Sequence, residues 1–127
     1  MNRYSIELSE EQMQLIAQCL EDIHRFASGQ CNLNYTVLEV LRELPRKEQM
    51  ERREQAEGLL RQVKHILFPG MHDNSSKNYN GTEFGGNTYQ IYRTILHQLA
   101  VDNNWDNVYS SPTLPSGTMC EIKIKKL

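Results

Sequence analysis

Alternation of apolar and polar residues predicts β-strands at both ends of the chain. Near the start, Tyr4, Ile6 and Leu8 share one side of an extended segment, and residues 120–125 alternate in the same way near the end. Side chains of a strand point to opposite faces in turn, so this pattern is typical of a strand with one buried face. We expect the two segments to form a small antiparallel sheet with one wet face, and residues 107–110 fit a further short strand.

Between these ends, apolar residues recur at the three- and four-residue steps of α-helices. Ser9 and Gln12 form the pattern of a capping box, which predicts that a first helix begins there. Gly29 is placed to stop this helix in a left-handed conformation. The stripe expected to be buried comprises Met13, Leu15, Ile16, Cys19, Leu20, Ile23, Phe26 and Ala27.

Three more helices are predicted further along. Two cover residues 35–44 and 46–68, and Pro45 separates them because proline ends or kinks a helix. A long polar loop over residues 70–87 precedes the last helix, which we expect to begin near residues 87–88.

These elements together predict an α+β fold, in which a small antiparallel sheet from the N- and C-terminal strands packs against three to four α-helices. The 127 residues fit a single domain spanning residues 1–127.

The net charge of the chain argues against some classes of binding partner. The chain has 14 basic and 16 acidic residues and a net charge of −2, which argues against binding DNA through phosphate neutralisation. No apolar run approaches the roughly 20 residues that span a bilayer, and the first residues lack the apolar region of a signal peptide. We therefore expect a cytoplasmic protein without a membrane partner.

Motifs of catalysis and metal binding are lacking in the sequence. The three cysteines contain no Cys-x-x-Cys, and the four histidines contain no His-x-x-x-His, so we expect no metal and no cofactor. Neither a phosphate-binding loop nor a Gly-x-Ser-x-Gly motif occurs. The paired carboxylates at residues 10–11 and 21–22 fit solvated helical faces. We predict no catalytic residues and no enzymatic activity.

Three features could serve an anionic aromatic ligand. Arg25 lies near the end of the first helix, where a guanidinium group either favours the helix dipole or binds phosphate. The glycine-rich loop at residues 81–88 either is a flexible turn or presents N–H groups to a ligand, with Phe84 stacking on a base. Arg93 and His97 share a face of the last helix, which is either hydrated or ligand-binding.

Two short stretches carry a resemblance to a known family. Residues 25–30 read Arg-Phe-Ala-Ser-Gly-Gln, and residues 88–97 read Thr-Tyr-Gln-Ile-Tyr-Arg-Thr-Ile-Leu-His. Together with the order of elements, they resemble small bacteriophage and prophage proteins. The chain looks similar to the first-described group of Thoeris anti-defence proteins, which capture cyclic ADP-ribose signals made by bacterial TIR-domain sensors.

The resemblance implies sequestration of a nucleotide second messenger without cleavage, either a cyclic ADP-ribose isomer or cyclic oligonucleotides. It also implies a homo-oligomer with pockets where subunits meet. By position, Arg25 matches the helical arginine of that family and Phe84 the ring that stacks on adenine. The ligand-binding residues expected on this basis are Arg25, Phe84, Asn87, Arg93 and His97.

Two other functions remain open at this point. The charged stretch from Glu48 to Glu57 could dock on a host protein, which would make the chain a phage adaptor or inhibitor. A small enzyme acting on a nucleotide is the third alternative, because catalytic groups meet in space and not in sequence.

Overall fold

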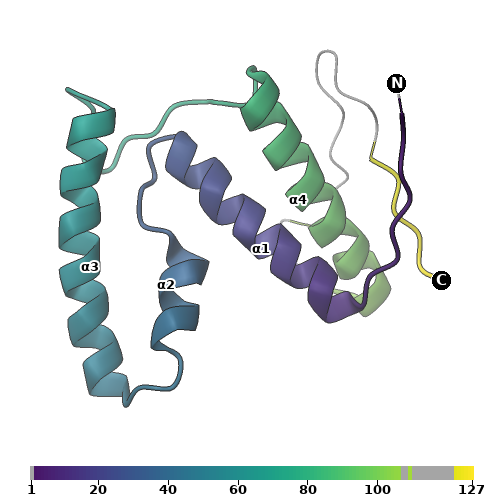
Figure 1. The fold of residues 1–127 in the computed structure, drawn as a ribbon, viewed down its shortest axis with the longest axis horizontal. Helices are drawn as coiled ribbons and strands as arrows, with labels where there is room; N and C mark the ends of the chain where they lie inside the picture. Colours follow the sequence, from purple (N-terminus) through teal and green to yellow (C-terminus); the bar gives the residue numbers. More distant parts are fainter. Residues whose placement is uncertain (1, 107–108, 110–121) are drawn as a thin grey trace.

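Four α-helices form in residues 2–106, 109 and 122–127, which are the residues that the computed structural model describes. They are α1 (Glu10–Ala27), α2 (Asn34–Leu41), α3 (Arg46–Leu67) and α4 (Glu83–Asn103). Figure 1 shows α1 crossing α4 on one side of the molecule and α2 beside α3 on the other. Among the helices, α1 packs on α4 and α2, whereas α3 packs on α2 alone.

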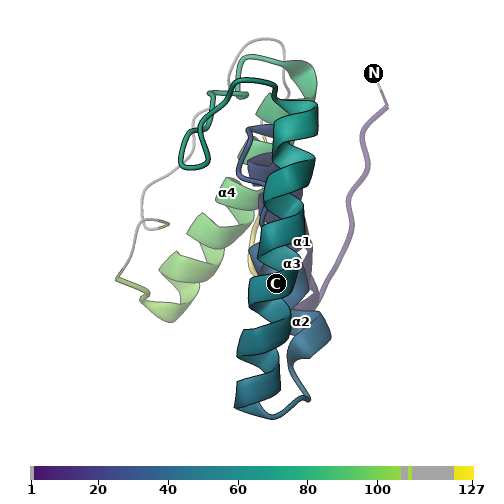
Figure 2. The ribbon, with the colours of Figure 1, turned by 90° about the vertical axis from the view of Figure 1, so that its left-hand side faces the viewer.

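The predicted α+β fold is wrong, because the described residues contain no strand and therefore no sheet. The two terminal segments are drawn across one another in Figure 1, but Figure 2 separates them. Tyr4 is 90% exposed, so the apolar side of its segment faces solvent instead of a core. Alternation of apolar and polar residues specifies which side chains share a face, but it does not supply a neighbouring strand. A β-sheet forms only when a second strand lies alongside to complete the backbone hydrogen bonds. The strand predicted at residues 107–110 lies outside the described residues except for Tyr109.

Both predicted ends of the first helix are confirmed. The hydroxyl of Ser9 accepts a hydrogen bond from the Gln12 backbone N–H at 3.1 Å, and the Gln12 side chain accepts one from the Ser9 N–H at 3.0 Å. This capping box satisfies two N–H groups that a helix start leaves without partners. Gly29 follows the helix with φ +98°, the left-handed conformation that favours glycine.

Helices α1 and α4 run antiparallel and hold the apolar core between them. The side chains of Asn103 and Glu10 meet at one end at 2.7 Å, and those of Thr88 and His24 meet at the other at 2.9 Å. The buried cluster consists of Ala17, Tyr92, Ile95, Leu96 and Leu99.

The side of α1 that packs on this core is not the side with the most apolar residues. Ala17 and the carboxylate-bearing Glu21 face inward, whereas Leu15, Cys19 and Ile23 are exposed. Leu15 alone is 59% exposed. The prediction of a buried stripe on α1 is therefore wrong for these residues, including Cys19, although Met13 and Leu20 do pack against the core.

Asp22 joins α1 to α2 by capping α2 from outside. Leu33, at the start of α2, has φ 46° and supplies no side-chain cap. The Asp22 carboxylate instead accepts the N–H groups of Tyr35 at 3.1 Å and Thr36 at 2.7 Å. A carboxylate at a helix N-terminus also stabilises the helix dipole.

Helix α4 begins earlier than predicted, because glycines that suggested a loop lie in its first turn. Thr82 caps the helix by accepting the N–H of Gly85 at 3.0 Å. A Cβ atom on Gly85 would overlap the backbone carbonyl of Tyr79. Glycine is needed at this position for close packing and not for chain flexibility.

We expect Gly85→Ala to lower the free energy of unfolding by about 1–3 kcal/mol, because the overlap outweighs the better helix propensity of alanine. Gly81→Ala is the matched control, since its Cβ would meet nothing within 4 Å. Urea unfolding should move the control by no more than about 0.5 kcal/mol. Equal stabilities of the two variants would contradict the packing assigned to Gly85.

Candidate functional site

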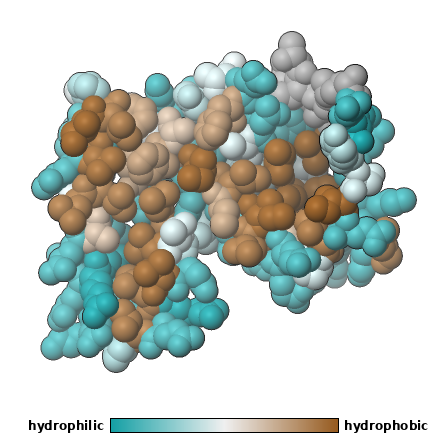
Figure 3. Space-filling view, viewed as in Figure 1, coloured by the Kyte–Doolittle hydropathy of each residue, from teal (hydrophilic) through white to brown (hydrophobic). Residues whose placement is uncertain are grey.

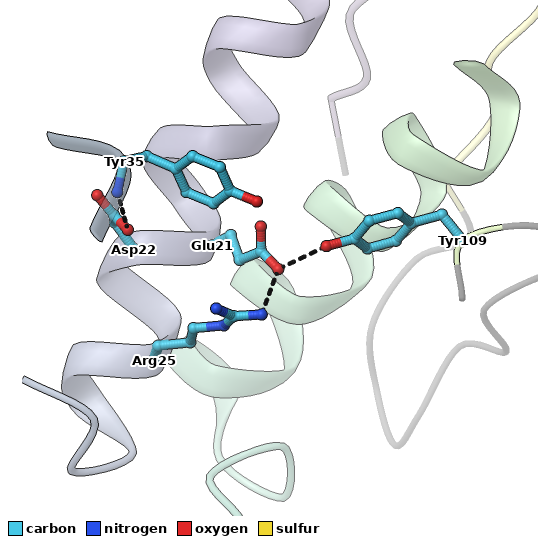
Figure 4. Close-up of polar contacts among 5 residues, drawn as sticks. All are labelled: Glu21, Asp22, Arg25, Tyr35 and Tyr109. Carbon is cyan, nitrogen blue, oxygen red and sulfur yellow. Dashed lines mark hydrogen bonds and ion pairs between the residues drawn. The ribbon is translucent and has the colours of Figure 1, made fainter. Parts of the chain in front are cut away.

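Three of the five residues predicted to bind a ligand contact either a buried carboxylate or the tyrosine that bonds to it. The carboxylate belongs to Glu21 on α1, which is 1% exposed. Arg25 and the hydroxyl of Tyr109 both donate to Glu21 Oε1, at 2.9 Å and 2.8 Å (Figure 4). The Arg25 guanidinium group is partly exposed and keeps further N–H donors for other partners.

The hydroxyl of Tyr35 also points toward this carboxylate in Figure 4. Burial raises the pKa of Tyr35, and the negative charge of Glu21 raises this pKa further. The same two causes raise the pKa of Tyr109 and of Tyr92. The three phenols therefore remain neutral near this carboxylate.

Tyr109 connects this carboxylate to Arg93 and His97, which are also predicted ligand-binding residues. Its ring centroid lies 5.0 Å from the guanidinium carbon of Arg93, within the range of a cation–π contact. His97 Nδ1 lies 3.0 Å from the Tyr109 carbonyl oxygen, which can only accept, so Nδ1 carries the proton. We call this group the Glu21 cluster; its members are Glu21, Arg25, Tyr35, Arg93, His97 and Tyr109.

Phe84 and Asn87, the last two of the five predicted ligand-binding residues, lie elsewhere on α4. Phe84 precedes Arg93 by nine residues, which places the two on opposite sides of the helix and about 14 Å apart along its axis. The Phe84 ring is edge-on to Tyr79, with ring centroids 6.2 Å apart. Phe84 remains 49% exposed, and Asn87 is exposed. A single chain therefore does not bring the five residues to one site.

Glu21 and Tyr109 belong to this cluster but were not predicted from the sequence. Glu21 was assigned to a solvated face, but it lies four residues after the buried Ala17 and three before the buried His24. Residues at these spacings share a helical face, so the signal is present once the inward side of α1 is known. Tyr109 falls in the segment 107–110 that the sequence predicts as a strand, and that pattern gives no sign of a contact with Glu21, 88 positions away.

His24 occupies the end of the α1–α4 interface next to the Glu21 cluster. The Thr88 hydroxyl donates its proton to the carbonyl of Phe84 or Gly85, so it accepts from His24 Nδ1 at 2.9 Å. Burial lowers the pKa of His24 from 6.5, and the charge of Arg25 lowers it further. The imidazole is therefore a neutral structural donor at pH 7.

None of the five predicted residues lines either of the two surface cavities described in this part of the chain. One cavity of about 380 Å³ lies between α3, residues 29–32 and residues 73–75. The other, of about 270 Å³, lies between α2 and α3. The Glu21 cluster therefore lies apart from both described cavities.

Apolar side chains remain exposed over several helices. Figure 3 shows them spread across the face that α1 shares with α2 and α3. On α1, the exposed residues Leu15, Cys19 and Ile23 follow one another at four-residue steps; we call them the apolar stripe of α1. On the remaining helices the large exposed apolar residues are Leu38, Val40, Met50, Leu59, Ile66, Leu67, Phe84 and Val101.

Across the described ranges, no three His, Cys, Asp or Glu side chains are grouped to hold a metal ion, and no helix has the length and apolarity to cross a membrane. Comparisons with known protein families, with curated proteins and with solved structures found no match for this chain.

Tyr109→Phe should lower the free energy of unfolding by about 1.5–3 kcal/mol, because it removes a hydrogen bond to a buried carboxylate. Tyr4→Phe is the control, since Tyr4 lies almost fully in solvent. Chemical unfolding of both variants tests this, and a Tyr109→Phe protein as stable as the control would show that the bond to Glu21 contributes nothing.

We also expect stability to depend on pH through His24. Its folded-state pKa is lowered, so below about pH 6.5 the unfolded chain binds more protons than the folded chain, and the free energy of unfolding falls as the pH falls. Between pH 7 and 5.5, His24→Gln should lose less stability than the wild type. His72→Gln on the exposed loop is the control and should follow the wild type.

Proposed function

We propose that the protein is a non-catalytic binding protein that assembles with copies of itself and holds a nucleotide signal of the cyclic ADP-ribose class unchanged. In this proposal it acts in the cytoplasm of an infected bacterium. The observation that carries the proposal is the exposed apolar stripe of α1, on the helix that also bears Arg25. An apolar helix face left in water is typical of an interface with another molecule.

The stripe has the symmetry that a two-fold contact requires. Leu15 and Ile23 lie at equal distances along α1 on either side of Cys19. If two copies pack α1 against α1 in antiparallel fashion, Leu15 of each copy meets Ile23 of the other, and the two Cys19 residues face each other. Each apolar side chain then leaves water, and full burial of one stabilises by about 1.5–3 kcal/mol.

Assembly would also bring together the predicted ligand-binding residues that lie apart in one chain. A drug-sized ligand needs a concave site that covers most of its surface. One chain offers a partly exposed guanidinium group at Arg25 and a half-exposed ring at Phe84, and neither of the two described cavities includes them. A site completed by a second copy would combine the cation of one chain with the ring of another.

A protein adaptor remains the second candidate, and the exposed apolar residues of α3 favour it. Leu59 and Ile66 lie in the second half of α3 and point to solvent. The charged stretch Glu48 to Glu57 instead forms pairs within the helix, with Arg53 bound to Glu57 at 2.9 Å. A host protein that docks on α3 would therefore contact its apolar second half.

Assembly through α1 is tested by Leu15→Glu and Ile23→Glu. Both variants place a charge in the proposed two-fold contact, and we expect each to dissociate the oligomer to a monomer. Leu59→Glu makes the same change on α3 and should leave the oligomer intact. Size-exclusion chromatography with light scattering gives the mass of each, and mild oxidation of the wild type should form a Cys19–Cys19 crosslinked dimer. A monomeric wild type would reject the proposed assembly.

Ligand binding is tested by calorimetry with cyclic ADP-ribose isomers and cyclic di- and trinucleotides. Phe84→Ala should weaken binding at least tenfold, because stacking on a base contributes about 1–3 kcal/mol. Arg25→Ala should weaken it as well, with Arg52→Ala on α3 as the control. Chromatography after heating should recover the ligand intact. Absence of heat with every ligand would end the nucleotide proposal, and a degraded ligand would indicate an enzyme.

A further inference from the structure

The cavity of about 380 Å³ beside α3 has a composition that suits a ligand, although the sequence analysis did not single it out. One wall is α3, and the opposite walls are the turn after α1 at residues 29–32 and the loop at residues 73–75. We call it the polar cleft. Leu60 is the one large apolar side chain in its lining, so a ligand must be hydrophilic.

Lys64 is a buried cation in the wall of the polar cleft. It is 3% exposed, and its ammonium group donates to the backbone carbonyls of Asp73 at 2.8 Å and Ser75 at 2.7 Å. An ammonium group has three protons, and these bonds use two of them. Within the described chain no carboxylate lies within ion-pair distance of it. Buried charges are normally paired with an opposite charge, so the Lys64 ammonium group is suited to bind an anion.

The carboxylates that line the polar cleft are paired with other groups. Glu57 accepts from Arg53 at 2.9 Å, and Asp73 lies 2.7 Å from the imidazole of His65. Arg61 is one turn before Lys64 and also lines the cleft. No ion pair ties the Arg61 guanidinium group to another described residue. The cleft therefore holds two cations that lack carboxylate partners.

The remaining lining supplies neutral donors. Gln30, Asn32 and Asn74 carry side-chain amides, which can donate to sugar or phosphate oxygens. Burial raises the pKa of the Cys31 thiol, so no thiolate competes for Lys64 at neutral pH. The polar cleft thus combines two cations with several donors and a volume within the range of small-molecule sites.

We propose that the polar cleft binds a phosphate monoester of a small polar metabolite, with the phosphate between Lys64 and Arg61. The guanidinium fork gives two parallel N–H bonds to phosphate oxygens, and the third ammonium proton of Lys64 gives another. The volume left beyond the phosphate accommodates a group the size of a sugar. This site shares no residue with Arg25 or Phe84 and stands or falls independently of the nucleotide proposal.

Titration calorimetry at low ionic strength with ribose 5-phosphate, inorganic phosphate and succinate tests this site. We expect one ribose 5-phosphate per chain, weaker binding of inorganic phosphate and no heat from succinate. Tighter binding of succinate would overturn the assignment to phosphate. Absence of heat from ribose 5-phosphate and from inorganic phosphate would overturn the site.

Arg61→Gln is the decisive variant, because Arg61 is exposed and we expect the fold to tolerate its replacement. It should weaken ribose 5-phosphate binding about tenfold or more, since a charge-assisted hydrogen bond contributes about 1.5–3 kcal/mol. Arg52→Gln changes a comparable exposed arginine of α3 outside the cleft and should bind as the wild type does. Equal weakening of binding by both variants would show nonspecific electrostatic attraction. Unchanged binding by Arg61→Gln would show that the phosphate binds at another site. Amide shifts of residues 73–75 on titration give a second readout that does not require a Lys64 variant.

Discussion

The buried carboxylate of Glu21 is the constraint on which the α1–α4 half of the molecule depends. A carboxylate withdrawn from water must be paired or hydrogen-bonded, or it costs several kcal/mol. Arg25 comes from the next turn of the same helix, whereas Tyr109 lies beyond the end of α4 in the sequence. The need to satisfy one charge thus positions Tyr109, which in turn contacts Arg93 and His97.

A second constraint is that the apolar surface of α1 exceeds what the described residues cover. Ala17 is the buried apolar residue at the centre of α1, and its small side chain allows α4 to approach closely. The larger side chains of the apolar stripe remain on the outside. A domain of this size buries a limited share of its surface, so the remaining apolar area is available for other molecules. The proposed assembly and the adaptor alternative are two ways to use this same area.

The two proposed ligand regions differ in how complete they are within one chain. Arg25 and Phe84 lie on one helix pair but need another molecule to enclose a ligand. The polar cleft already has opposite walls, formed by α3 and the loop bound to Lys64. Their charges agree in sign, because both leave cationic groups accessible in a chain whose net charge is −2. A local positive field can attract an anion even when the whole protein is acidic.

The sequence by itself determined the elements that local interactions control. The capping box at Ser9, the left-handed Gly29 and the break at Pro45 act within a few residues, and each defines a helix end that the structure confirms. Only the tertiary structure decided which face of α1 is buried, whether the alternating ends find a strand partner, and which carboxylate lies at the centre. These outcomes depend on contacts between residues such as Glu21 and Tyr109, 88 positions apart. Periodicity ranks the faces of one helix by polarity, but packing of α1 on α4 and α2, together with charge compensation at Glu21, selects the face that is buried.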